Sequence, residues 1–208
     1  MSLTAALEAV LDAALRDADA VADDVLLSRN LKTVAETIVQ RHGVAPVRLH
    51  RVAIDLPHAT KMAVAGDPGH ETPGGSPHVV RGTAVDLFLA VDGAETMAHV
   101  IGDDEDLLHA GVTVDVEKSR IVVRYVAERP LANAANRHFD ESLRYIEAQV
   151  EIANKEVAEF NEALEPAIVK ELERGKVLAE ERQTFAKGLK LPESYERWWG
   201  RPGCQVRS

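Results

Sequence analysis

The feature of this sequence that most constrains its fold is a run of apolar residues in the last third, at alternating spacings of four and three. The run has eight members: Phe139, Leu143, Ile146, Val150, Ala153, Val157, Phe160 and Leu164. Such spacings place side chains on one narrow stripe of an α-helix, and the flanking positions here are mostly charged. A helix that lies on a sheet usually drifts from this repeat. The stripe therefore predicts a long helix that faces another helix.

Two kinds of partner fit this stripe. The first is a separate protein or a second copy of the chain, and the interface residues are then expected to be Phe139, Leu143, Ile146, Val150, Val157, Phe160 and Leu164. The second is the chain itself, because its N-terminal helices or residues 166–189 can cover the same stripe. Pro166 follows the run closely and predicts a kink or a break, since proline lacks an amide proton and disfavours helical angles in the residue before it.

The rest of the chain divides into N-terminal helices and a β-rich middle. Apolar residues at helical spacing predict a helical hairpin or one kinked helix over 3–42, and Gly43 suits its C-terminal cap. Alternating or β-branched segments predict strands at 47–56, 78–91, 112–116 and 120–127, with a further short strand at 96–101. A phase slip near Arg51 indicates a β-bulge. The connections are too short for helical crossovers, so the strands are expected to be mostly antiparallel.

These elements predict an α+β protein with N-terminal helices, a central sheet of four or more strands, and long, coiled-coil-like C-terminal helices. We expect a helix-plus-sheet domain over 1–130 and a C-terminal helical arm over 131–192 that packs on it or projects from it. An irregular tail over 193–208 is expected to be dispensable for folding. It holds both tryptophans, Trp198 and Trp199, which fit either a docking peptide or a cover over the body.

Charge and cysteine content exclude several classes of function. The 208-residue chain has a formal net charge of −10, which disfavours nucleic acids and anionic membrane surfaces, because phosphate binding needs a basic field. The sequence has no apolar run long enough to span a bilayer, and its acidic, amphipathic start is unlike a signal peptide. The single cysteine, Cys204, excludes a disulfide framework and a cysteine-based zinc site. We expect a cytoplasmic protein without nucleic-acid or membrane partners.

The stretch GDPGHETPGGSPH at 66–78 raises the one chemical hypothesis. Imidazole and carboxylate groups bind zinc and other transition metals, so a metal-dependent enzyme that uses Asp67, His70, Glu71 and His78 is the alternative function. The spacing matches no metal motif, however, and glycine and proline are typical of a turn-rich connection. The sequence also contains no nucleophile elbow and no phosphate-binding loop. We therefore interpret 66–78 as a mobile connection, and we expect no cofactor.

Residues 121–188 resemble the end of a group of uncharacterised bacterial proteins in which the pattern I…N-x-E-x-x-x-F-N-x-x-L recurs. Here the pattern includes Asn154, Glu156, Phe160, Asn161 and Leu164. The resemblance implies a bacterial system of defence or stress response, and it carries no activity with it. Together with the helical stripe, it leads to the expected function of a non-catalytic module for protein–protein interaction or assembly.

Overall fold

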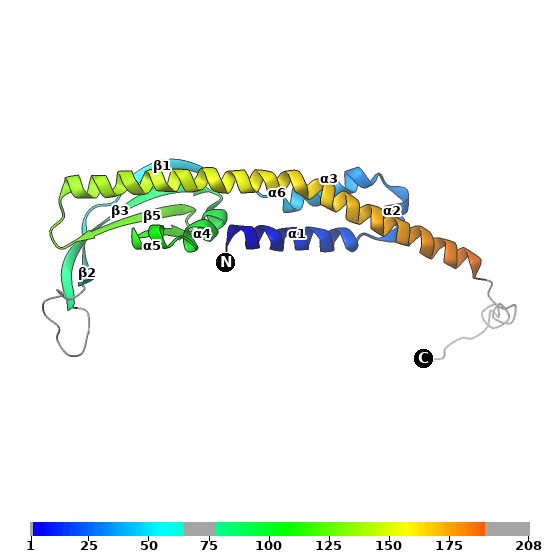
Figure 1. Cartoon of the computed structure of the whole chain (residues 1–208), viewed down its shortest axis with the longest axis horizontal. Helices are drawn as coiled ribbons and strands as arrows, with labels where there is room; N and C mark the ends of the chain where they lie inside the picture. The colour runs from blue at the N-terminus through cyan, green and yellow to red at the C-terminus, as the bar shows by residue number, and fades with distance from the viewer. Residues whose placement is uncertain (1, 65–77, 190–208) are drawn as a thin grey trace, which may run out of the picture. The chain divides into compact units, whose positions relative to one another are not determined.

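The structure is a computed structural model that describes residues 2–64 and 78–189 (Figure 1). It contains two compact units. Unit 1 consists of Met1–Asp12 and His42–Leu164, and unit 2 consists of Ala13–Arg41 and Glu165–Ser208. The sequence placed a boundary near residue 130, whereas these units divide the first and the last helix between them. None of the helices in the described ranges has both the length and the hydropathy of a membrane span.

Three helices open the chain: α1 (Leu3–Asp19), α2 (Asp23–Ser28) and α3 (Leu31–His42). The sequence predicted two helices or one kinked helix over this range. The additional boundary follows Ser28, where Arg29 and Asn30 separate α2 from α3. Asn30 Oδ1 accepts a hydrogen bond from the Lys32 amide at 2.9 Å, which satisfies one of the free donors at the start of α3.

The sheet confirms the α+β class and is antiparallel throughout. Its five described strands are β1 (Arg48–Ile54), β2 (His58–Val64), β3 (His78–Asp92), β4 (Val112–Asp115) and β5 (Arg120–Ala127). Their order is β1-β3-β5-β4, and β2 also pairs with β3. The register of β1 shifts between Leu49 and Val52, which confirms the predicted bulge.

Strands β1 and β2 follow one another along the same side of β3. Strand β1 pairs with residues 87–92 of β3, and β2 pairs with residues 78–84. The 15-residue β3 is long enough for both. The sequence did not predict β2, because HATKMAV shows only a weak alternation of apolar and polar residues.

Two short helices replace the strand that was expected at 96–101: α4 (Ala94–Gly102) and α5 (Glu105–His109). Gly93 has a φ of 78°, so it turns the chain out of β3 and directly into α4. Asp104 caps α5 through its side chain, which accepts from the Leu107 amide at 3.0 Å. The acidic run 103–106 therefore lies at the start of α5.

The last element, α6, is one helix of 57 residues from Ala132 to Gly188. The prediction of a C-terminal helix is confirmed, but Pro166 lies inside α6 and does not end it. A proline at this position removes the bond to the carbonyl four residues earlier, that of Glu162. Both Pro166 and Glu162 are exposed, so water can satisfy that carbonyl.

The main core of unit 1 lies between one face of the sheet, α4 and the first part of α6 (Figure 1). Its buried members include Leu87, Leu89, Met97, Ile101, Ile121, Val123, Phe139 and Ile146. A smaller cluster joins Leu3 and Leu7 of α1 to Ala153 of α6.

Six of the eight stripe residues belong to these two clusters or pack against them, namely Phe139, Leu143, Ile146, Val150, Ala153 and Phe160. Phe139, Ile146, Val157 and Leu164 are at most 5% exposed, and Leu143, Val150 and Phe160 are half-buried. Among the described residues, the chain itself thus buries four of the seven predicted interface residues, whereas a contact of the stripe with a separate protein stays a prediction. The physical reason for this burial is that the stripe faces the sheet near Phe139 and Ile146 and faces α1 near Ala153, so one regular spacing serves two kinds of neighbour.

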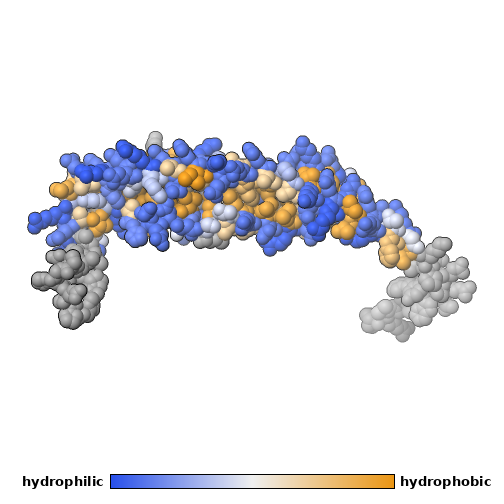
Figure 2. Space-filling view, in the orientation of Figure 1, coloured by the Kyte–Doolittle hydropathy of each residue, from blue (hydrophilic) through white to orange (hydrophobic). Residues whose placement is uncertain are grey.

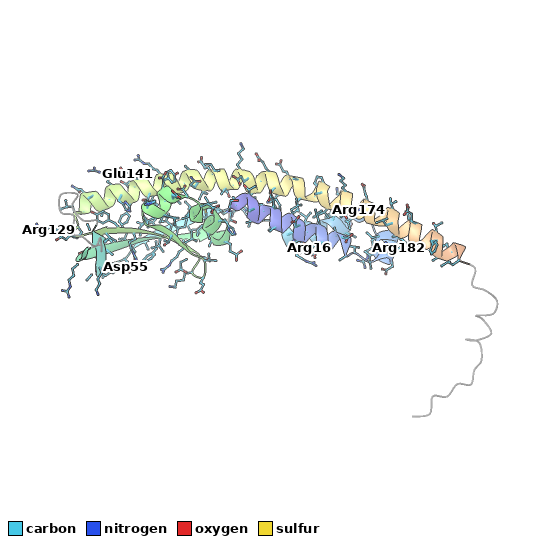
Figure 3. All side chains as sticks on the ribbon, turned by 60° about the horizontal axis from the view of Figure 1, so that its bottom comes forward. Arg16, Asp55, Arg129, Glu141, Arg174 and Arg182 are labelled. Carbon is cyan, nitrogen blue, oxygen red and sulfur yellow. The ribbon has the colours of Figure 1, made fainter. Side chains whose placement is uncertain are left out.

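Unit 2 has its own buried residues and ion pairs. Leu26 of α2 and Ile168, Leu172 and Ala179 of α6 are at most 3% exposed. Arg182 donates two hydrogen bonds to the carboxylate of Asp23, one of them at 2.8 Å, and lowers the pKa of that carboxyl. Arg174 and Arg182, both on α6, are labelled in Figure 3.

Candidate functional site

The first candidate site is a shallow hollow of about 300 Å³ between α1 and α6 in unit 1, which we call the α1–α6 groove. Its lining consists of Thr4, Leu7, Glu8, Leu11, Glu156, Glu159 and Phe160. Figure 2 shows apolar surface between α1 and this stretch of α6. Of the seven predicted interface residues, Phe160 is the one in this lining.

The groove follows from the spacing of apolar residues on the two helices. Leu7 and Leu11 lie four residues apart and so share one face of α1. Leu7 is buried against Ala153, whose small side chain allows the helices to approach closely. Leu11 and Phe160 flank this contact and stay half-buried. They leave apolar surface that a further side chain can cover.

The polar lining of the groove is acidic. Glu8 and Glu159 are exposed and Glu156 is half-buried, and the described lining includes no basic residue. Lys155 approaches Glu159 at 3.9 Å, but both side chains are largely exposed, so this pair is weak. The groove thus combines an apolar floor with negative charge, a pattern that suits a basic, amphipathic segment.

A second, larger hollow of about 850 Å³ includes much of the sheet face that points away from the main core. Asp86 of β3 lies directly opposite Arg124 of β5. Arg124 donates from Nε to Asp86 Oδ1 and from Nη2 to Asp86 Oδ2, both at 2.7 Å. Asp55, which directly follows β1 and also lines the hollow, is labelled in Figure 3, as is Glu141 of α6.

Four charged residues of this hollow form two ion pairs, Arg124 with Asp86 and Arg120 with Asp115. The hydrogen bonds from Arg124 hold the pKa of the buried Asp86 carboxyl below its ordinary value and raise the pKa of Arg124. Arg120 lies 4.3 Å from the ring centre of Phe88, and its Nε donates to Asp115 Oδ2 at 3.2 Å. Because both oxygens of Asp86 are occupied, this carboxylate acts as an anchor for Arg124. The network accounts for a stable, polar sheet face.

One buried atom beside this network has no hydrogen-bond partner among the described residues, namely His138 Nε2. The ring of His138 lies 5.6 Å from that of Tyr125 and 5.8 Å from that of Phe139. These aromatic contacts explain where the imidazole packs.

The predicted metal ligands fall mostly outside the described residues. Asp67, His70 and Glu71 lie outside the described residues, as does the rest of the proposed mobile connection except its last residue, His78. The tail with Trp198 and Trp199 also lies outside them. His78 begins β3, and its backbone is paired with Val64. Within the described residues, there is no cluster of three or more His, Cys, Asp or Glu side chains that could hold a metal ion.

The two asparagines of the recurring C-terminal pattern have a clear role in the structure. Asn154 Oδ1 accepts from the Val47 amide at 2.7 Å, and its Nδ2 donates to the Val47 carbonyl at 3.0 Å. Asn161 repeats this arrangement with Val44, at 3.0 and 2.8 Å. A side-chain amide can replace the hydrogen bonds of a neighbouring strand because it carries one acceptor and two donors. The pattern therefore holds the segment between α3 and β1 against α6.

Sequence reasoning missed the α1–α6 groove and the Asp86–Arg124 pair. A signal for the pair was present, because Asp86 interrupts the apolar positions around it in a predicted strand and Arg124 does the same in another. Their pairing required the strand register. The helical spacing of apolar residues over 3–42 was recognised, but a stripe on one helix does not identify the element that it packs against.

Comparison with known proteins adds no family to this description. No protein-family model, curated protein or solved structure matches the chain.

Proposed function

We propose that this protein is a non-catalytic protein-interaction module that binds a basic, amphipathic helix of a partner protein in the α1–α6 groove. The observation that carries the proposal is the coincidence of half-buried Leu11 and Phe160 with three glutamates around one hollow. A helix presents apolar anchors at intervals of three or four residues, which suits a groove between two other helices. Lysine or arginine next to those anchors would pair with Glu8, Glu156 or Glu159.

The size of the groove favours a reversible contact. A hollow of about 300 Å³ accommodates few side chains, and each large apolar side chain that it buries contributes about 1.5–3 kcal/mol. Exposed ion pairs add about 0.2–1 kcal/mol each. Association itself costs several kcal/mol in lost freedom of motion, so we expect moderate affinity.

The proposed setting is the bacterial cytoplasm. The resemblance of residues 121–188 to bacterial proteins supports a bacterial origin. A single cysteine in 208 residues suits a reducing compartment such as the cytoplasm. The net charge of −10 is consistent with a basic protein partner and disfavours nucleic acid and membranes.

Site-specific photocrosslinking in the cells that produce the protein tests this proposal. A photoreactive residue replaces Glu156 at the groove in one variant and Glu162 in another. Glu162 is the matched control because it is an exposed glutamate two residues beyond Phe160, about 200° around the helix from it. We expect an adduct at position 156, absent at position 162, whose crosslinked peptide maps to a helix with lysine or arginine beside apolar residues.

A third variant checks that the apolar floor is used. Leu11→Asp in the background with the photoreactive residue at position 156 is expected to abolish the adduct while the protein stays folded by circular dichroism. The proposal is wrong if the yield at position 162 equals that at position 156, if neither position gives an adduct, or if a folded Leu11→Asp protein gives the same adduct.

A further inference from the structure

Strand β1 and the two residues that follow it carry three exposed apolar side chains that the proposed function does not use. Val52 is 50% exposed, Ile54 is 62% exposed and Leu56 is 82% exposed. Their spacing of two residues places them on one face of an extended chain. Strand β1 pairs with β3 on one side, and no strand among the described residues pairs with its other side. We call residues 52–56 the β1 edge.

The direction of the backbone groups in the β1 edge is fixed by one hydrogen bond. The Asp55 amide donates to the Asp86 carbonyl at 2.9 Å, so Asp55 points its amide towards β3. Amide and carbonyl directions alternate along a strand, and Val52 and Ile54 therefore point theirs towards the free edge. The exposed apolar residues and the unpaired backbone groups thus belong to the same positions.

We infer that the β1 edge binds the β1 edge of a second copy of this chain, antiparallel and centred on Ile54. A two-fold axis at this residue places Ile54 opposite Ile54 of the other copy and Val52 opposite its Leu56. The apolar positions 52, 54 and 56 are symmetric about residue 54, so the edge is complementary to itself. The amide and carbonyl groups of Ile54 in the two copies then form a hydrogen-bonded pair, and the Val52 amide of each copy donates to the Leu56 carbonyl of the other.

The surrounding residues limit this contact to a short segment. The bulge between Leu49 and Val52 disrupts a regular edge on one side, and Pro57, which lacks an amide proton, follows on the other. The Leu56 amide already donates to Asp55 Oδ1 at 2.8 Å, so only its carbonyl is offered. Four intermolecular backbone bonds and three apolar pairs remain. The expected dimer is weak and depends on protein concentration.

Cysteine crosslinking tests the register of this pairing. All variants carry Cys204→Ser, so that the introduced cysteine is the only one. In the inferred pairing, the two copies of residue 54 have Cα atoms about 5.5 Å apart, which a disulfide can bridge. The two copies of residue 56 are displaced by four residues, about 14 Å. We expect Ile54→Cys to form a disulfide dimer under mild oxidation and Leu56→Cys to stay monomeric.

Sedimentation velocity over a range of concentrations tests the dimer without a crosslink. We expect the unsubstituted chain to shift from monomer to dimer as concentration rises, and Ile54→Lys to remain monomeric and folded. Leu108→Lys is the matched control, because Leu108 is 46% exposed on α5 and should leave the dimer intact. A monomer at every concentration overturns the inference, as does equal crosslinking of Ile54→Cys and Leu56→Cys. Neither result bears on the α1–α6 groove.

Discussion

Replacing Asn154 with aspartate tests how α6 holds the segment before β1. The substitution preserves shape and keeps an acceptor for the Val47 amide, but an ionised carboxylate cannot donate to the Val47 carbonyl. Val47 is 2% exposed, so water does not easily replace the lost donor. A buried acceptor without a partner costs about 1–3 kcal/mol, and a negative charge facing that carbonyl increases the cost, so we expect about 2–3 kcal/mol at neutral pH.

Urea denaturation at neutral and at mildly acidic pH measures this effect. A loss of this size shifts the midpoint by about 1 M, given slopes of about 1–3 kcal/mol/M. In acid the aspartate becomes protonated and its O–H can donate to the carbonyl, so the difference from the unsubstituted chain should narrow. Asn133→Asp is the control, because Asn133 is exposed in the first turn of α6 and should change stability by less than about 0.5 kcal/mol. An unchanged midpoint for Asn154→Asp, or an equal loss at both pH values, would refute the reasoning.

Two further substitutions test the sheet. Arg124→Met leaves the buried Asp86 without its partner; because Arg124 is half-exposed, we expect a loss of about 1–3 kcal/mol in neutral denaturation. Arg124 lowers the pKa of Asp86 in the folded protein, so the ion pair stabilises the fold above the ordinary aspartate pKa. This stabilisation disappears as the pH falls through the lowered pKa. An equal loss of stability for Arg124→Met in acid would contradict this reasoning. Gly111→Ala should lower the thermal midpoint by several degrees, since φ is 74° and a Cβ would lie 2.6 Å from the Arg124 carbonyl oxygen. Gly102→Ala is the control and should leave the thermal midpoint unchanged, because no atom lies within 4 Å of the added Cβ. Equal thermal midpoints for Gly111→Ala and Gly102→Ala would refute the argument.

The class of fold could be predicted because each signal was local. The apolar repeat over 139–164 predicts a helix whatever element covers it. The alternation around Leu87 and Leu89 likewise predicts a strand without knowledge of the strands that pair with it. Segment 96–101 misled because a buried helix such as α4 is apolar on most sides and resembles a short strand. Strand β2 was missed because its apolar and polar residues alternate only weakly, and its stability depends on pairing with β3.

The candidate site could not be predicted because it depends on which elements meet. Phe160 was recognised as part of a stripe, but the sequence does not say that α1 approaches it at Leu7 and Leu11. The same limit explains why the sequence left two kinds of partner open for the stripe. A 4-3 repeat specifies a helix with one buried side and leaves open whether a sheet, an internal helix or another chain buries it.

The central claim, that the acidic α1–α6 groove binds a basic helix, is tested most directly by calorimetric titration with the crosslinked segment as a synthetic peptide. The comparison is between the unsubstituted chain, the groove variant Glu8→Gln/Glu156→Gln, and the control Glu162→Gln. Two lost ion pairs at about 0.2–1 kcal/mol each predict affinity about 2- to 30-fold weaker at low salt. That difference should shrink as salt is added, and the control should bind like the unsubstituted chain. Equal affinity of the groove variant and the unsubstituted chain at low salt would contradict the claim.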